Sequence, residues 1–492
     1  MRKLGCLVIL AVLLGGCSRT EKAVINVFFT ADVEGFYFSR PEPRLDNQEA
    51  GGYAILSSLL QKQEQPYLLL DGGNWFGSGA EGTLSKGAYV SALAKELPFT
   101  AGTITEKDLT YGWPTARNIV KELNYPFVVS NLRLENQLPW PLHDYQIRTV
   151  EDIKIGIFGL ISPLQNQERL PGLKVLDPIE TAQEMTTLLR EKGVDVVVVL
   201  SSLGLGTAQG GDNASLAAEV EGIDLILASN QDNEQPETEK VGRTLIVYPG
   251  AKLDGVGQVR LSFGKNKQLR NMEFTDVPLL KEKYGENETI AQVATTLLNK
   301  TRSQMNKTVT HAAREIAINL NDQSPLGGVL AQCLHKWAKL DGAILNASSI
   351  RSPLPPGTIT EFDLYKSYPY GDNITFLTLK GAALTKALEA SLNTSDNFPQ
   401  IAGFTVQYMQ TPNGKRITRI TLDNGRIVRP ENTHRVAVTD HILSGGFGHD
   451  EFINALEFKN TFVEARQIMR SCLLKQKKVE VPPTKDRWKL VS

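Results

Sequence analysis

Six stretches of almost uninterrupted apolar residues recur through the first half of the chain. Such runs are typical of strands buried on both faces, as in parallel or mixed sheets covered by helices. Helix-like segments alternate with them, which predicts a layered α/β domain. The runs are VINVFF, YLLL, FVVS, KIGIFGLI, VDVVVVLSS and IDLILAS, and the helix-like segments are 53–63, 87–97, 114–123, 178–192 and 215–220.

The pattern changes near residue 284. The segment NETIAQVATTLLNKTRSQMNKT has the periodicity of one long amphipathic helix with polar flanks, which predicts a connector between two domains. Beyond it, helices at 325–340, 381–392 and 461–475 surround a strand-rich tract with a turn at TPNGK, so a smaller α+β domain is expected. The expected division is a leader at 1–16, a tether at 17–23, domains at 24–283 and 311–475, a connecting helix at 284–310, and a polar tail at 476–492.

The first residues indicate export. Arg2 and Lys3 precede LGCLVILAVLLGG, an apolar run too short to span a bilayer as a helix, which is a signal-peptide pattern. The run ends in Leu14-Gly15-Gly16-Cys17, which resembles the lipobox of bacterial lipoproteins. The resemblance implies that Cys17 is lipidated and anchors the protein to a membrane. Ser18 rather than aspartate follows, so we expect the outer membrane, with the protein facing the periplasm.

The net charge and the number of cysteines limit the expected binding partners and the expected disulfide bonds. The 492 residues carry a net charge of -1, which gives no electrostatic reason to expect nucleic acid as a partner. With Cys6 removed and Cys17 acylated, only Cys333 and Cys472 remain. Both lie in helix-like, half-apolar stretches, so we expect two buried thiols, and one disulfide is the alternative.

Polar side chains follow the apolar runs at the point where each strand should end. In open α/β sheets, ligands bind beyond the carboxyl ends of the strands, so these side chains are expected to converge on one crevice. Asp, Asn and Ser also favour strand exits as turn formers, which is the alternative explanation for any single cluster. The clusters are Asp32-Val33-Glu34, Asp71-Gly72-Gly73-Asn74, Ser130-Asn131, Ser201-Ser202 and Ser229-Asn230-Gln231-Asp232, with Glu106-Lys107-Asp108 as a further one.

Several fragments resemble a known family in order and spacing. FFTADVEG, LLLDGGNWFGSG, TEKDLTYG and VVSNL are similar to parts of the metallophosphoesterase domain of bacterial 5'-nucleotidases and UDP-sugar hydrolases. Downstream, SPLGGVLAQCL, LNASSIRSPLPPGTITEFDLYKSYPYGDN and SGGFGHDEF are similar to the C-terminal nucleotide-binding domain of that family. The resemblance implies a two-metal active site that hydrolyses phosphate esters of nucleotides.

The expected metal site has lost its histidines. By this resemblance Asp32 and Asp71 are retained, whereas Lys107 stands where the catalytic histidine is expected and Thr110 replaces its partner aspartate. Only His143 of the six histidines lies in the first domain, and it fits no motif. Imidazole suits zinc and similar ions, so standard dinuclear zinc chemistry is not expected. The expected ligand positions are Asp32, Glu34, Asp71, Asn74, Glu106, Ser202, Asn230 and Asp232.

Two interpretations of this acidic site remain open. In the first, the carboxylates and amides form an all-oxygen site for a hard cation such as Ca²⁺ or Mg²⁺. In the second, which we prefer, Lys107 acts as an internal counter-ion and turns the metal centre into a salt-bridge network, with no cofactor. Either way, the means of activating a water molecule is largely missing.

The expected nucleotide-binding face of the second domain is better retained. In NASSIR, the resemblance makes Asn346 and Arg351 ligand contacts, and Arg351 could pair with a phosphate or carboxylate. Tyr370 occupies the first base-stacking position, and Phe447 or His449 the second. Half-buried core aromatics and a surface ion pair are the alternative explanation.

We therefore expect a lipid-anchored member of this nucleotidase family. Its hydrolysis of extracytoplasmic nucleotides or UDP-sugars would be weak, altered or lost. The alternative is a non-catalytic envelope lipoprotein that binds nucleotides or nucleosides. The sequence does not identify protein partners.

Overall fold

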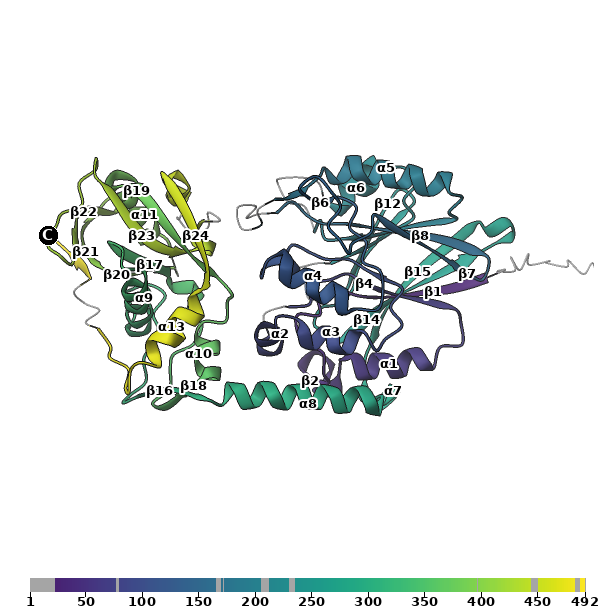
Figure 1. Cartoon of the computed structure of the whole chain (residues 1–492), viewed down its shortest axis with the longest axis horizontal. Coiled ribbons are helices and arrows are strands. Elements are labelled where there is room, and N and C mark those ends of the chain that lie inside the picture. Colours follow the sequence, from purple (N-terminus) through teal and green to yellow (C-terminus); the bar gives the residue numbers. More distant parts are fainter. Residues whose placement is uncertain are drawn as a thin grey trace, which may run out of the picture.

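The computed structural model shows two domains joined by a long helix (Figure 1). It describes residues 23–76, 79–164, 170, 172–204, 212–229, 235–395, 397–443, 450–482 and 487–491. The expected leader and the lipidation site Cys17 lie outside these residues. Within the described ranges, no helix is both long and apolar enough to cross a membrane.

Two sheets form the centre of the first domain. One has the strand order β15-β14-β1-β4-β5, and the other has the order β12-β13-β11-β10-β8-β7. Their facing sides enclose a core of aliphatic and aromatic side chains that includes Val27, Phe29 and Val198. The strands are β1 (Ala23–Thr30), β4 (Tyr67–Asp71), β5 (Ala101–Gly102), β7 (Tyr145–Val150), β8 (Ile153–Leu160), β10 (Val196–Ser201), β11 (Leu225–Ala228), β12 (Glu237–Val241), β13 (Thr244–Tyr248), β14 (Gly255–Phe263) and β15 (Leu269–Pro278).

Helices cover the outer faces of both sheets, because the apolar strands need burial on two sides. One group of helices packs against the first sheet through a hydrophobic cluster that includes Trp75, Phe127 and Leu56. A second group of helices packs against the second sheet through another hydrophobic cluster. The first group contains α1 (Tyr53–Gln61), α3 (Ala88–Ala94) and α4 (Trp113–Glu122), and the second contains α5 (Pro178–Glu191) and α6 (Asn213–Glu219). The predicted layered α/β class is confirmed.

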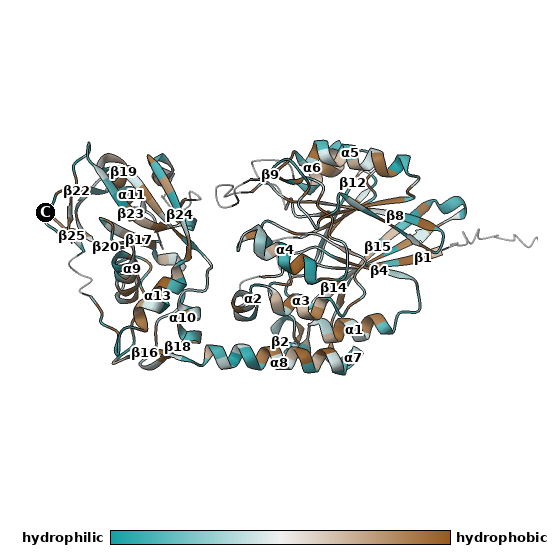
Figure 2. Ribbon diagram, in the orientation of Figure 1, coloured by the Kyte–Doolittle hydropathy of each residue, from teal (hydrophilic) through white to brown (hydrophobic). Residues whose placement is uncertain are grey.

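The connector is α8 (Glu288–Met305), which follows the short α7 (Lys281–Tyr284). Asn287 caps its first turn, since its side chain accepts a hydrogen bond from the backbone N–H of Ile290 at 3.2 Å. Ile290 and Ala294 are buried in the core of the first domain, so the first half of α8 is fixed to that domain. Figure 2 shows both hydrophilic and hydrophobic residues along it.

The second domain contains the five-stranded sheet β20-β17-β23-β19-β24. One face packs on α9, α10 and α13, and the other packs on α11 and the small sheet β22-β21-β25, giving two separate cores. The helices are α9 (Pro325–Ala338), α10 (Glu361–Ser367), α11 (Gly381–Leu392) and α13 (Ala465–Leu473). The strands are β17 (Gly342–Asn346), β19 (Asn373–Lys380), β20 (Pro399–Ala402), β21 (Phe404–Thr411), β22 (Gly414–Leu422), β23 (Thr433–Thr439), β24 (Glu457–Glu464) and β25 (Trp488–Leu490).

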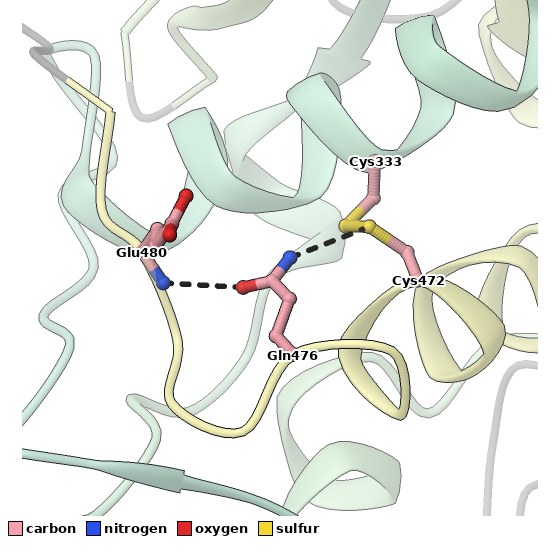
Figure 3. The surroundings of a disulfide bond; sticks show 4 residues. All are labelled: Cys333, Cys472, Gln476 and Glu480. Carbon is pink, nitrogen blue, oxygen red and sulfur yellow. Dashed lines mark hydrogen bonds between the residues drawn. A yellow bond between two sulfur atoms is a disulfide. The ribbon is translucent and has the colours of Figure 1, made fainter.

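Three expectations for this domain need correction. The segment expected to be helical from residue 461 begins as β24, and the helix starts only at Ala465. The expected polar tail contributes β25, whose Trp488 is buried against Phe398. Cys333 of α9 and Cys472 of α13 form a disulfide, with Cα atoms 5.6 Å apart, rather than two free thiols (Figure 3).

Candidate functional site

The ends of β1 and β4 bring two of the expected site residues together. Asn74 donates a hydrogen bond from Nδ2 to Oδ1 of Asp32 at 2.8 Å, and both side chains are buried. Asp32 and Asn74 have left-handed backbone conformations, with φ of 51° and 60°, and Glu34 has φ of 51°. Such φ values are rare for residues other than glycine and cluster at functional sites. The structure therefore holds these side chains at one strained strand edge.

Asp71 lies beneath this edge and is committed to hydrogen bonds inside the domain. Its Oδ1 accepts from the Gly73 N–H at 3.0 Å, and its Oδ2 accepts from Trp75 Nε1 and the Tyr125 hydroxyl, each at 2.9 Å. Burial raises the pKa of Asp71 to about 6, although these donors act to lower it. Asp71 therefore supports the loop that carries Asn74.

A residue that sequence reasoning left out of the site, Asp108, organises the same loop. Its carboxylate accepts hydrogen bonds from the backbone N–H groups of Asn74, Trp75 and Thr105 at 2.7 to 2.9 Å. Burial raises its pKa to about 7, against the effect of these three donors. The sequence contained an indication of this role, because Asp108 belongs to the polar cluster at residues 106–108.

The neighbouring candidates Glu106 and Lys107 differ in their exposure to solvent. Glu106 is half-buried, whereas Lys107 and Thr110 are exposed. Among the described residues, the Lys107 ammonium forms no ion pair with an acid, so the expected salt-bridge network around it is not formed there. The physical reason is that Lys107 begins a 3₁₀ turn whose buried side is taken by Asp108 and Leu109.

The second sheet contributes Ser202 at the end of β10. Its Oγ accepts a hydrogen bond from the Ser162 N–H at 3.2 Å, so it ties two loops of this sheet together. Asn230 and Asp232, the remaining expected ligands, lie outside the described residues. Within the described ranges, no group of three or more His, Cys, Asp or Glu side chains is placed to hold a metal ion.

The described side chains do not fit a dinuclear transition-metal centre. Oδ1 of Asp32 accepts from the Asn74 amide, and both oxygens of Asp71 accept from neighbouring donors. Ser202 offers a hydroxyl in place of an imidazole, which is the nitrogen ligand that zinc favours.

In the second domain, β17 delivers Asn346 to a short loop. Asn346 is fully buried, donates from Nδ2 to Ser348 Oγ and accepts from Ser349 Oγ, each at 2.9 Å. Ser348 in turn donates from its hydroxyl to Asn397 Oδ1 at 2.7 Å. The serines at the expected glycine positions thus satisfy Asn346 internally, and it shapes the loop instead of facing a ligand.

Arg351 and Tyr370 are the exposed members of the expected binding face. Arg351 is anchored by its backbone, whose N–H donates to the Ser367 carbonyl at 2.9 Å, and its guanidinium is exposed. Tyr370 is 39% exposed and its ring packs edge-on against Tyr368 at 6.2 Å. The other expected stacking residues, Phe447 and His449, lie outside the described residues.

Comparison with known families adds a decisive observation. Residues 304–456 match the family "5'-nucleotidase, C-terminal domain". The second domain is a 5'-nucleotidase C-terminal domain. Solved structures extend the similarity in fold to nearly the whole chain: a putative 5'-nucleotidase from Staphylococcus aureus has a TM-score of 0.74 at 18% identity and covers 95% of this chain and 100% of its own. A 5'-nucleotidase precursor from Thermus thermophilus has a TM-score of 0.66 at 20% identity, covering 95% and 99%.

Curated relatives agree with the expected resemblance to 5'-nucleotidases, which is confirmed. A 5'-nucleotidase from Bos taurus is 23% identical over 81% of this chain and 78% of its own length. The metallophosphoesterase YunD of Bacillus subtilis is 25% identical over 65% of this chain and 72% of its own length. The chain spans only 27% of another relative from this organism, the endonuclease YhcR.

These relatives correct one expectation. The sequence led us to expect either no cofactor or a hard cation at an all-oxygen site. YunD is named a metallophosphoesterase, and the similar solved structures are 5'-nucleotidases, so metal-dependent chemistry is what the relationship implies. The expectation came from the missing histidines alone. Ligand substitution in one chain is a weaker guide to the cofactor than the class of protein to which the chain is related.

Proposed function

We propose that this protein binds nucleotides or nucleosides outside the cytoplasm and that its phosphohydrolase activity is weak, altered or lost. Relationship to 5'-nucleotidases supports the ligand class. A disulfide between Cys333 and Cys472 supports an oxidising compartment. A similar protein, Lmo0130 of Listeria monocytogenes, is named a cell wall protein, which agrees with a surface location.

The observation that carries the catalytic part of the proposal is the hydrogen bond between Asn74 and Asp32. Asn74 donates an N–H from Nδ2 to the Asp32 carboxylate, so the amide nitrogen, which has no lone pair for a metal, faces the acid in this structure. Asp32 and Asn74 are both buried, so this hydrogen bond is shielded from water.

In the second domain, the groups suited to bind a nucleotide are Tyr370 and Arg351. A partly exposed tyrosine ring can stack on a base, and an exposed guanidinium can pair with a phosphate in two parallel hydrogen bonds. The backbone N–H of Arg351 donates a hydrogen bond to the carbonyl of Ser367, which lies three residues before Tyr370. This bond joins the segment that carries Arg351 to the segment that carries Tyr370. This part of the site needs no metal to bind a nucleoside.

A thermal-shift titration with adenosine and AMP tests the binding function. Adenosine should raise the Tm of the full chain, and Tyr370→Ala should weaken adenosine binding about tenfold or more, because base stacking on an aromatic ring contributes about 1–3 kcal/mol. Phe362→Ala, which removes another exposed aromatic of the same domain, is the matched control and should bind normally. Equal adenosine affinity in the two variants would refute the role of Tyr370.

The lipid anchor is a separate part of the proposal. Diacylation of Cys17 should place the protein in the membrane fraction, and Cys17→Ser should release it into the soluble fraction. Mass spectrometry of the amino-terminal peptide measures the modification directly. A Cys17→Ser protein that stays in the membrane fraction would count against the anchor.

A further inference from the structure

A cavity of about 330 Å³ lies where the two domains meet, apart from the expected metal and nucleotide sites. The first domain contributes Thr83 of α2 (Ala80–Ser85) and Lys86, which directly follows this helix, and the second contributes residues of α10 and α13. Lys307 adds a further side chain just after α8. The cavity is thus built by all three parts of the chain.

Positive charge dominates the lining. Lys86, Lys307, Arg466 and Arg470 face two acids, Glu361 and Glu464, so two positive charges remain in excess. Arg470 is paired with Glu361, its Nε lying 2.5 Å from a carboxylate oxygen. The ion pairs of Glu464 are longer, since Lys86 Nζ and Arg466 Nη2 each lie 3.9 Å from one of its carboxylate oxygens. This spacing is longer than a charge-assisted hydrogen bond.

The guanidinium of Arg466 is fixed in position by contacts within the second domain. Its Nη1 donates to the backbone carbonyls of Tyr368 at 3.2 Å and Pro369 at 2.8 Å, and its guanidinium lies over the Tyr365 ring at 5.0 Å. A guanidinium fixed in this way loses little conformational freedom when a ligand binds. Burial raises the pKa of the Tyr365 hydroxyl, which therefore stays protonated and able to donate.

We propose that this junction cavity binds a small anion carrying a phosphate group. The cationic side chains come from both domains, so a bound phosphate would bridge them. Arg466 also supports the carbonyls just before Tyr370, which places the cavity next to the candidate nucleoside site without making the two identical. The phosphate group can belong to inorganic phosphate or to a nucleotide.

Isothermal titration of the full chain with sodium phosphate, at an ionic strength held constant with sodium chloride, tests the site. We expect one phosphate per chain, and the exposed-lysine variant Lys86→Gln/Lys307→Gln should bind it about tenfold or more weakly, because it loses charge-assisted hydrogen bonds. Lys386→Gln on α11 is the matched control and should bind as the wild type does. Phosphate affinity that is unchanged in the double variant, or no binding above the chloride control, would overturn the proposal.

Two further titrations separate the sources of phosphate and the two sites. AMP should compete with inorganic phosphate if the phosphate belongs to a nucleotide, and adenosine should not compete. Tyr370→Ala should leave the affinity for inorganic phosphate unchanged, so failure of the nucleoside site and failure of the junction site give different results. Phosphate binding that disappears in Tyr370→Ala would contradict a separate junction site.

Discussion

Single side chains organise the strand edge at which the first-domain site is expected. Asn74 donates its amide to Asp32, and Asp71 and Asp108 use their carboxylates to hold the loop that carries Asn74. Acids at strand ends were predicted to gather at one edge, and the structure brings Asp32 and Asn74 together there. What each carboxylate accepts could not be read from the sequence, because a buried acid is as suitable for holding backbone N–H groups as for binding a cation.

Asp108 is expected to be the most important structural acid of this loop. Asp108→Ala would leave the backbone N–H groups of Asn74, Trp75 and Thr105 buried without their acceptor. We predict a loss of at least about 3 kcal/mol in the free energy of unfolding, since each of the three unsatisfied buried groups costs about 1–3 kcal/mol. Chemical denaturation measures it, with the exposed Glu64→Ala as control. A loss below about 1 kcal/mol would show that these groups find other partners.

A buried ion cluster outside the candidate site predicts a pH effect. Asp254 is buried between Arg40 and Arg44, and burial raises its pKa to about 6 although both arginines act to lower it. A carboxyl with a raised pKa binds its proton more tightly when folded than when unfolded. Its contribution to stability is therefore present at low pH and is lost as the pH rises from about 4 to about 6.

The variant Asp254→Asn removes this titration. Chemical denaturation between pH 4 and pH 7 should give a stability that falls less steeply with pH in the variant than in the wild type. Identical slopes in the two proteins would mean that Asp254 does not titrate in this range.

At the scale of helices and strands, the apolar runs correctly predicted buried strands of the first domain. The run VDVVVVLSS became β10, and the amphipathic segment after residue 284 became α8, because burial on two faces and a helical period leave clear patterns. Strand β24 was missed, since this edge strand is exposed or half-buried along most of its length and carries no long apolar run. Strand β25 was missed because it depends on pairing with β21, far away in sequence.

The disulfide between α9 and α13 is expected to stabilise the second domain. It links residues 139 positions apart, and a closed loop of this length restricts the unfolded chain strongly. Cys333→Ser/Cys472→Ser should lower the free energy of unfolding by about 2–4 kcal/mol, as measured by denaturation. Dithiothreitol should lower the wild-type stability and leave the double variant unchanged. A thiol titration that finds two free cysteines in the denatured, unreduced protein would contradict the bond.

At the scale of the whole molecule, the chain joins a layered α/β domain to a second domain that matches the 5'-nucleotidase C-terminal family. The sequence predicted this pairing and the connecting helix, because both depend on patterns that extend over many residues. It did not predict the junction cavity, which exists only through the relative placement of α2, α10 and α13.

Phosphate release from AMP by the purified full chain, with zinc or manganese supplied, tests the central claim most directly. Enzymes typically turn over at about 1–10³ s⁻¹, and we predict a rate below about 10⁻² s⁻¹, because Ser202 offers a hydroxyl at a position where the family resemblance implies an imidazole ligand. Adenosine binding in the same preparation confirms that the protein is folded. Turnover of AMP at about 1 s⁻¹ or faster would contradict the account.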